Sequence, residues 1–206
     1  MGLYDHYVVP WLTDRMCGGR AFNRPRRTVV PRAEGRVLEV GFGSGHNLPW
    51  YEAGKVTELL ALEPSAEMRE RAAGRVAEAA VPVRFLDLPG EQVPLDDASV
   101  DSIVVTYTIC TIPGIQAAIA EMRRVLKPAG RLHFAEHGRA PDAAIARWQD
   151  RLNPLYRSFA GGCNLNRDVP ALLTEGGFRI DELDTYYMRR TPRVLGYNFI
   201  GSAIPR

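Results

Sequence analysis

Short apolar runs alternate with helix-forming stretches through the middle of this 206-residue chain. The predicted strands are residues 37–40, 58–62, 83–86, 100–106 and 131–136. Helices are predicted between them at residues 66–79 and 115–126. Strands separated by helices pair in parallel, because each helix carries the chain back to the edge where the next strand begins. This order predicts an α/β fold with a doubly wound sheet and helices on both faces.

The last part of the chain has a different pattern. A helix is predicted at residues 169–175, followed by strands at 178–188 and 197–203 with a tight connection at Thr191–Pro192. Two strands joined in this way form a hairpin, which would complete a mostly parallel sheet with an antiparallel C-terminal strand. The sheet then has seven strands. Because no internal repeat or linker divides residues 1–206, we expect a single domain.

The first 35 residues show no strand pattern. Leu3, Tyr7 and Trp11 recur at helical spacing, and residues 11–17 predict a short helix ended by Gly18–Gly19. We interpret this stretch as a helical flap that packs on its own domain. Arginines are concentrated just after it, at Arg20, Arg24, Arg26, Arg27, Arg32 and Arg36. Such a run is a solvated face or, alternatively, a contact with an anionic surface or substrate.

Composition excludes several classes of protein. The net charge of +2 does not suggest a nucleic-acid binder. Three cysteines in a chain of this size favour a reducing compartment, so we expect a cytoplasmic protein. The sequence has no CxxC pair and no HExxH motif, so we expect no metal. No run approaches the roughly 20 apolar residues of a membrane span, which leaves at most a peripheral membrane contact.

A glycine-rich turn follows the first predicted strand, with the sequence Glu39-Val-Gly-Phe-Gly-Ser-Gly45. Glycines at alternate positions allow a tight turn and let a ligand lie against bare main chain. The second predicted strand ends in Glu63, about 20 residues further on, where a carboxylate can accept hydrogen bonds from both hydroxyls of a ribose. In an open α/β sheet, ligands bind at this edge, near the point where the strand order reverses. The pattern therefore predicts a nucleoside site.

The nucleoside is not a typical dinucleotide. A dinucleotide fingerprint has the form GxGxxG, and here His46 stands at the place of its last glycine. The acidic Glu39 would repel a pyrophosphate, whereas it suits the ammonium group of an amino-acid tail. S-Adenosylmethionine has such a tail and a ribose but no phosphate. Glycines alone do not exclude a dinucleotide, however.

Four successive motifs resemble those of class I methyltransferases of the ubiquinone-biosynthesis type. They are VLEVGFGSG, ALEPSAEM, DDASVDSIVV and AEMRRVLKPAGRL, and they cover residues 36 to about 137 in the family's order. The resemblance implies a Rossmann-like fold and S-adenosylmethionine as cofactor, with S-adenosylhomocysteine as product. It also implies a division into the helical flap (1–35), a cofactor-binding half (36–137) and an acceptor-side lid with the C-terminal hairpin (138–206).

The same resemblance implies the cofactor-binding residues. Those expected around the methionyl part are Glu39, Gly41, Gly43 and Gly45. Glu63 would hold the ribose, Gly90 and Glu91 would lie beside the adenine, and Thr106 would border the sulfonium. Phe42, Asn47 and Pro64 are further expected cofactor-binding residues. In one respect the chain departs from the family. Many members have Asp or Asn before the position of Gly90, and this chain has Pro89, which weakens the expectation for the adenine.

A second, narrower resemblance concerns the methyl acceptor. Glu136-His137, Trp148-Gln149 and the segment GCNLNR at residues 162–167 are similar to the mammalian microsomal alkyl-thiol S-methyltransferases, and Cys110 also has a counterpart there. Those proteins carry a hydrophobic N-terminal anchor that we do not find here. The resemblance implies a small-molecule acceptor, namely a small thiol or hydrogen sulfide. The segment GSGHNLPWY also resembles bacterial phospholipid N-methyltransferases, so a lipid amine is the rival acceptor.

The candidate catalytic residues are His137, Asn164 and Arg167. A histidine titrates near neutral pH, so His137 could remove the proton of a thiol, or it could be a structural residue at a strand end. Asn164 and Arg167 could line the acceptor pocket or cap the following helix. His133 and His137 are about 13 Å apart on a strand, too far to share one metal ion. Cys110 and Cys163 are interpreted as core or loop thiols.

Three functions remain open at this point. The first is a methyltransferase with a small thiol acceptor, and the second is a methyltransferase for a phospholipid amine or another metabolite modified on oxygen or carbon. The third is a dinucleotide-dependent oxidoreductase or a non-catalytic nucleotide-binding module. Neither the acceptor nor the oligomeric state follows from the sequence.

Overall fold

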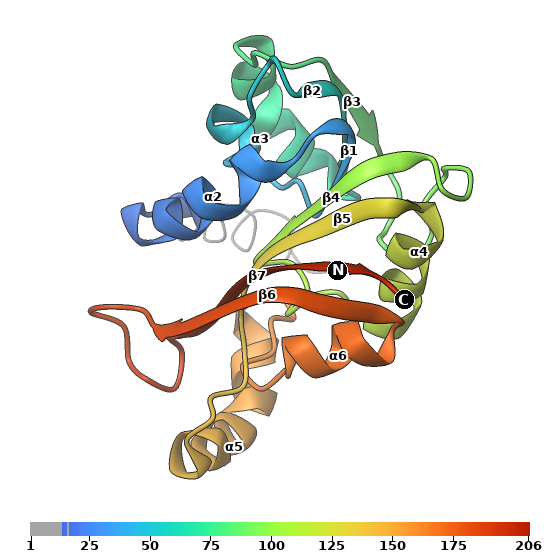
Figure 1. Ribbon diagram of the computed structural model, residues 1–206. Coiled ribbons are helices and arrows are strands. Elements are labelled where there is room, and N and C mark those ends of the chain that lie inside the picture. Colours follow the sequence, from blue (N-terminus) through green and yellow to red (C-terminus); the bar gives the residue numbers. More distant parts are fainter. Residues whose placement is uncertain (1–13, 16) are drawn as a thin grey trace.

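The computed structural model describes residues 14, 15 and 17–206 (Figure 1). The predicted helical stripe at Leu3, Tyr7 and Trp11 lies outside the described residues. Within the predicted helix at 11–17, residues 14, 15 and 17 are helical. No helix in the described part of the chain is both long and apolar enough to cross a bilayer.

The structure contains the predicted strands and helices. The strands are β1 (Gly35–Val40), β2 (Val56–Leu62), β3 (Val83–Leu86), β4 (Val100–Thr106), β5 (Leu126–His137), β6 (Phe178–Tyr187) and β7 (Tyr197–Pro205). The α-helices are α2 (Asn23–Val29), α3 (Ala66–Ala77), α4 (Ile115–Val125), α5 (Ala143–Phe159) and α6 (Val169–Glu175). Short 3-10 helices are η2 (Arg20–Phe22), η3 (Val30–Arg32) and η4 (Leu48–Trp50).

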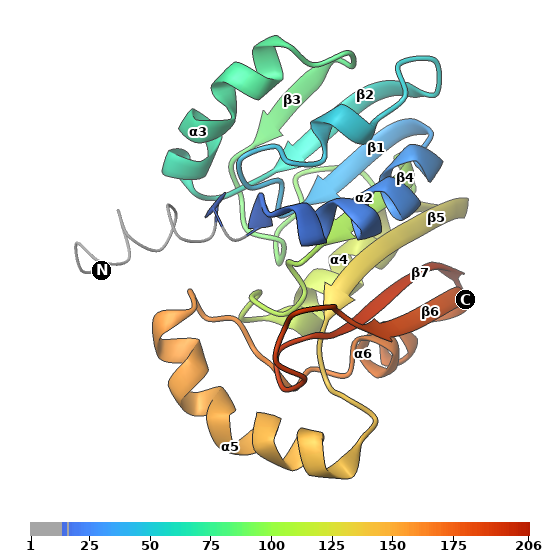
Figure 2. The same cartoon turned by 90° about the vertical axis from the view of Figure 1, so that its left-hand side faces the viewer.

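The strands form one seven-stranded sheet in the order β3-β2-β1-β4-β5-β7-β6. The first five strands pair in parallel, and β7 pairs antiparallel with both β5 and β6. This confirms the predicted fold class, including the C-terminal hairpin. The strand order reverses between β1 and β4, and the arrowheads of β1, β2 and β3 lie at one edge of the sheet (Figure 2). A ligand site is expected at that edge.

Two hydrophobic cores lie on the two faces of the sheet. Leu38 of β1 packs in one core with Ile119 of α4 and Leu173 of α6, whereas the adjacent Val37 packs in the other core with Val29 of α2 and Ala72 of α3. Successive residues of a strand point to opposite faces, so one apolar run supplies both cores. The helices therefore cover both faces, as predicted.

Two helices were not delimited from the sequence, although α2 lies within the predicted helical flap (1–35). The arginine-rich segment folds as α2, and Arg26 within it is buried, so the expectation of a solvated face is wrong for this residue. Its guanidinium donates to Asn47 Oδ1 at 3.0 Å and to the main-chain carbonyl of Cys17 at 2.7 Å, and these bonds offset the cost of burying its charge. Helix α5 lies away from the sheet (Figures 1 and 2) and has Pro154 inside it, which hides its helical pattern.

Candidate functional site

The predicted nucleoside site lies where the strand order reverses. The glycine turn follows β1, Glu63 follows β2, and Thr106 ends β4, so all three lie at the carboxyl edge of adjacent strands. The turn is anchored to β2, because the main-chain N–H groups of Gly41 and Phe42 both donate to the carbonyl of Leu62, at 3.0 and 3.1 Å. The sheet thus brings together the residues that were predicted to bind the cofactor.

The glycine turn uses backbone conformations that favour glycine. Gly41, Gly43 and Gly45 have φ values of 72°, 59° and 82°. A Cβ added at Gly41 would lie 2.2 Å from Thr108, whereas one at Gly43 would meet only the Met68 Cε, at 3.5 Å. The space beside Gly43 is therefore open on the side where a ligand would approach, and the turn presents bare main chain there.

Glu39 lies at the centre of a buried polar network. Its two carboxylate oxygens accept hydrogen bonds from Asn47 Nδ2 at 2.9 Å and from Tyr51 Oη at 2.6 Å. Asn47 Nδ2 also lies 3.0 Å from Thr106 Oγ1, and Asn47 Oδ1 accepts a bond from Arg26 Nε at 3.0 Å. Three predicted residues, Glu39, Asn47 and Thr106, therefore share one network that links β1 to β4.

Burial raises the pKa of Glu39 to about 7, although the hydrogen bonds from Tyr51 and Asn47 act in the opposite direction. A buried carboxyl group with this pKa is poised to bind a cation, because a positive charge restores the ionised form that burial disfavours. The ammonium group of S-adenosylmethionine would supply that charge. The residues present therefore fit the methionyl part of the cofactor.

Glu63 is buried at the end of β2 and holds the glycine turn. Its carboxylate accepts from the main-chain N–H of Gly43 at 2.8 Å and from that of Ser65 at 2.9 Å. Burial raises the pKa of Glu63, and these two bonds oppose the rise. A carboxylate offers about four acceptor positions, so about two remain for the hydroxyls of a ribose.

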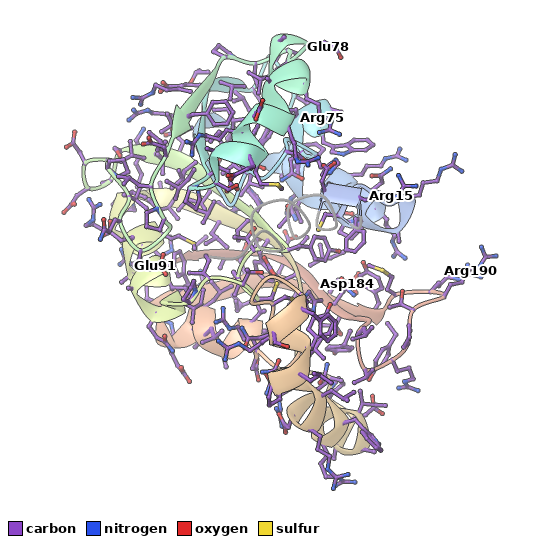
Figure 3. All side chains as sticks on the ribbon, turned by 180° about the vertical axis from the view of Figure 1, so that it is seen from behind. Arg15, Arg75, Glu78, Glu91, Asp184 and Arg190 are labelled. Atoms are coloured by element: carbon purple, nitrogen blue, oxygen red, sulfur yellow. The ribbon has the colours of Figure 1, made fainter. Side chains whose placement is uncertain are left out.

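Replacing Glu63 with alanine is expected to weaken S-adenosylmethionine binding by about 1.5–3 kcal/mol, the range for hydrogen bonds to a charged group. This corresponds to roughly a 10- to 150-fold higher Kd. Calorimetric titration of the purified protein measures it. The matched control is Glu78→Ala, at the far, exposed end of α3 (Figure 3), which should bind like the wild type. Equal affinities of the two variants would remove Glu63 from the site.

The other predicted cofactor residues, Glu91, Gly90, Phe42 and Pro64, differ in burial and in their contacts. Glu91 Oε1 accepts from the main-chain N–H of Gly114 at 2.8 Å, so Glu91 lies beside the start of α4 (Figure 3). Gly90 packs near Val40 and Ile112. The Phe42 ring packs edge-on against Phe85 in the core, and Pro64 is exposed. Glu91 and Phe42 thus have structural partners, and a role toward the cofactor remains a prediction for all four residues.

On the acceptor side, His137 lies close to Cys110 and Cys163. His137 Nε2 lies 3.0 Å from Cys163 Sγ, and the ligand atoms of Cys110, His137 and Cys163 all lie within 4.8 Å of one another. The hydrogen bond from the Cys163 thiol holds the pKa of Cys110 well below its usual range. The pKa of Cys163 is raised, chiefly because its proton is shared with Cys110. Burial alone would lower the pKa of His137, but the charge of Cys110 and its hydrogen bond raise it.

The side chains of Asn164 and Arg167 bond to main-chain carbonyl groups. Asn164 Nδ2 donates to the carbonyl of Cys110 at 2.8 Å, and Arg167 donates to the carbonyls of Ile109 and Ile112. Both residues tie the segment after α5 to the loop after β4. Their contacts support a role in positioning that loop, and a direct role toward an acceptor is left as a prediction.

Sequence reasoning missed three parts of the site. Tyr51 and Arg26 belong to the Glu39 network. Tyr51 ends the segment GSGHNLPWY and Arg26 lies in the arginine-rich run, but neither was predicted as a site residue. The grouping of Cys110 with Cys163 was also missed. The two are 53 positions apart in the chain, and no local spacing connects them.

Comparison with known proteins adds independent findings. Residues 38–134 match the family model of the methyltransferase domain. The human thiol S-methyltransferase TMT1B is 33% identical over 143 residues, which make up 66% of this chain and 58% of that protein. The phosphatidylethanolamine N-methyltransferase of Cereibacter sphaeroides is 30% identical over 146 residues, which make up 65% of this chain and 71% of that protein.

A solved structure of an S-adenosylmethionine-dependent methyltransferase from Thermotoga maritima superposes with a TM-score of 0.68 at 20% identity, covering 98% of each chain. At this identity the likeness supports the fold alone. The chain spans little more than half the length of human TMT1B, so the substrate of that relative does not carry over directly. The family model, the relatives and the nucleoside site agree, and the chain belongs to the S-adenosylmethionine-dependent methyltransferases.

Proposed function

We propose that this protein transfers the methyl group of S-adenosylmethionine to the sulfur of a small thiol or to hydrogen sulfide. S-Adenosylmethionine as methyl donor is supported by the pair of buried carboxylates, Glu39 and Glu63, on either side of the glycine turn. The thiol acceptor is supported by the similarity to human TMT1B and by the sulfur- and histidine-containing cluster at the same edge of the sheet.

The residues of the chain supply binding and orientation. Glu39 would hold the ammonium group, Glu63 the ribose and the turn at Gly43 the methionyl backbone. S-Adenosylmethionine supplies an electrophilic methyl group on a sulfonium. A thiolate that attacks it cancels a negative and a positive charge as the bond forms, so a site with little water favours the reaction. Alignment of the two sulfur atoms contributes several kcal/mol more.

The test is a methyl-transfer assay with labelled cofactor against a panel of acceptors. The panel contains small alkyl thiols, hydrogen sulfide, phenols and vesicles of phosphatidylethanolamine. We expect label to enter the thiols at a rate that rises with pH, because the thiolate is the nucleophile. The product should be a methyl thioether from each alkyl thiol and methanethiol from hydrogen sulfide, identified by mass spectrometry.

The control for this assay is Glu63→Ala. At low cofactor concentration the variant should be slow, and at saturating cofactor it should recover most of the rate, because the proposed role of Glu63 is to bind the cofactor. Transfer to vesicles or phenols with none to any thiol would refute the proposal.

A phospholipid amine is the second candidate acceptor. Helix α5 exposes four large apolar side chains, spaced 4, 3 and 4 residues apart on one face, at Trp148, Leu152, Leu155 and Phe159. Arg147, Arg151 and Arg157 lie on the same helix and could attract an anionic lipid surface. The relative from Cereibacter sphaeroides acts on phosphatidylethanolamine. The test of this second function is that the protein sediments with phosphatidylethanolamine vesicles and also methylates them.

A further inference from the structure

Three side chains that commonly bind metals converge at the end of β5. They are Cys110, which lies just after β4, His137, which ends β5, and Cys163, which follows α5. Their ligand atoms all lie within 4.8 Å of one another. Among residues 14, 15 and 17–206, these three make up the one such group of histidines, cysteines and acidic residues.

Hydrogen bonds hold the loops that carry the two cysteines in place. The carbonyl of Cys110 accepts two hydrogen bonds from Asn164, from its main-chain N–H at 2.9 Å and from its side chain at 2.8 Å. On the other side, Glu136 Oε1 accepts from the main-chain N–H groups of Thr108 and Ile109, at 2.7 and 3.0 Å. These bonds fix the main chain of the loop that carries Cys110 and link it to the segment after Cys163.

The spacing and chemistry of the cluster suit zinc. Around a tetrahedral zinc with bonds of about 2.0–2.3 Å, neighbouring ligand atoms lie roughly 3.6–3.8 Å apart. The cluster needs only small shifts to reach that arrangement from a span of 4.8 Å. Thiolate and imidazole ligands select zinc over hard cations such as magnesium. Two thiolates also balance the charge of a divalent ion.

We propose that Cys110, His137 and Cys163 bind one zinc ion, and that the acceptor thiol is its fourth ligand. The second part rests on the proposed function. Three protein ligands leave one coordination position open, as in catalytic rather than structural zinc sites. Cys110 is buried, whereas His137 and Cys163 are partly exposed, so the cluster can be reached from outside. The proposal replaces the expectation of no metal, which rested on local motifs only.

The cluster lies next to the donor site. The loop after β4 that leads to Cys110 contacts the glycine turn, because Thr108 Oγ1 donates to the carbonyl of Gly41 at 3.4 Å. An acceptor held at the cluster would therefore lie at the same edge of the sheet as the methyl group.

The proposed methyl transfer consists of one deprotonation and the exchange of one S–C bond for another. The acceptor thiol binds zinc as a thiolate, and its proton leaves to solvent, since a coordinating thiol is deprotonated by the metal. A lone pair of the thiolate forms the new S–C bond, and the S–CH3 bond of the cofactor breaks with its electron pair on the cofactor sulfur. The products are a thioether and S-adenosylhomocysteine. In this scheme zinc takes over the role of removing the thiol proton, and His137 is a ligand.

The first experiment measures the metal directly. Reduced full-length protein is stripped with a chelator, and then titrated with Zn²⁺ in competition with a chromophoric chelator and, separately, with Co²⁺. We expect one ion per chain, and for Co²⁺ a thiolate charge-transfer band with the visible bands of tetrahedral coordination. No stoichiometric binding would overturn the proposal. So would a Cys110–Cys163 disulfide, seen as the loss of two hydrogen atoms in the intact mass of freshly purified, unreduced protein.

Single substitutions assign the ligands. Cys110→Ser, Cys163→Ser and His137→Gln should each weaken Zn²⁺ binding by at least about 100-fold, since even changes outside the coordinating residues cost 10- to 100-fold. The matched control is Cys17→Ser, which removes the remaining cysteine and should leave Zn²⁺ affinity unchanged. Because Cys110 is buried, the partly exposed Cys163→Ser decides the matter if Cys110→Ser does not fold. Unchanged affinity in folded Cys163→Ser would overturn the assignment.

Activity then separates this inference from the proposed function. Adding Zn²⁺ to the stripped enzyme should restore thiol methylation, while calorimetry shows the same S-adenosylmethionine affinity with and without zinc. Full thiol methylation by the zinc-free enzyme would overturn the role of zinc and leave the proposed function standing. Zinc binding through these three residues without methylation of any thiol would refute the proposed function and the fourth-ligand role, and leave the metal site standing.

Discussion

Replacing Gly43 with valine is expected to abolish S-adenosylmethionine binding, with at least about a 100-fold higher Kd, or about 2.7 kcal/mol. The branched side chain would occupy the open space beside the turn, where an added Cβ meets only Met68. The φ of 59° also disfavours any L side chain, at a cost of about 1–2 kcal/mol in stability. The fold should therefore survive while the site is blocked. Calorimetry with S-adenosylmethionine, together with circular dichroism of the apo protein, measures both effects.

Gly74→Ala is the matched control for this substitution. Gly74 lies in α3 with no atom within 4 Å of an added Cβ, so alanine should bind the cofactor normally and raise helix stability by about 0.5–1 kcal/mol. Gly41 is a poorer probe, because a Cβ there would collide with Thr108 and disturb the loop after β4. Wild-type affinity in Gly43→Val would show that the cofactor binds elsewhere.

The second large effect concerns Glu39, whose burial is expected to lower the stability of the protein without cofactor. The folded-state pKa of about 7 lies above the unfolded value of 4.5, so the stabilising contribution of this carboxyl is complete below pH 4.5 and is lost as the pH rises through 7. Glutamine does not titrate. Relative to the wild type, Glu39→Gln should therefore gain about 3 kcal/mol in free energy of unfolding between pH 4.5 and pH 8.

The same substitution should weaken S-adenosylmethionine binding by roughly 10- to 150-fold, the equivalent of about 1.5–3 kcal/mol, because the charge that would face the ammonium group is removed. Urea unfolding of both proteins from pH 4.5 to 8, without cofactor, measures the stability difference. Glu58→Gln on β2 is the control. Arg36 and Arg84 hold the pKa of Glu58 below its usual value, so this variant should not gain stability on raising the pH. Parallel pH curves for Glu39→Gln and the wild type would contradict the prediction.

The buried acid and the glycine turn both cost stability in the free protein, the acid through loss of hydration and the glycines through loss of chain entropy. Both shape the site proposed for a cationic ligand. Binding of that ligand would offset this loss of stability, since a ligand that binds only the folded state stabilises it.

The sequence was sufficient for the fold and for the family, and it placed the predicted cofactor residues at one edge of the sheet, because the signals involved are local. Strand and helix patterns repeat every few residues, and all seven predicted strands end within two positions of the observed ones. The glycine turn and Glu63 are linked by one strand–helix–strand spacing, and the parallel sheet must bring them to the same edge. Where the local signal was weak, as in α2 and in α5 with its internal proline, no helix bounds were predicted.

Only the tertiary structure brought the acceptor-side residues together. Cys110, His137 and Cys163 belong to three segments, and their meeting depends on how the loop after β4 and the segment after α5 pack on the end of β5. The burial of Arg26 against Asn47 is of the same kind. A pattern within one segment determines which face a residue occupies, whereas long-range contacts are set by the packing of all segments at once. For that reason the methyl donor could be predicted from the sequence, and the candidate metal site could not.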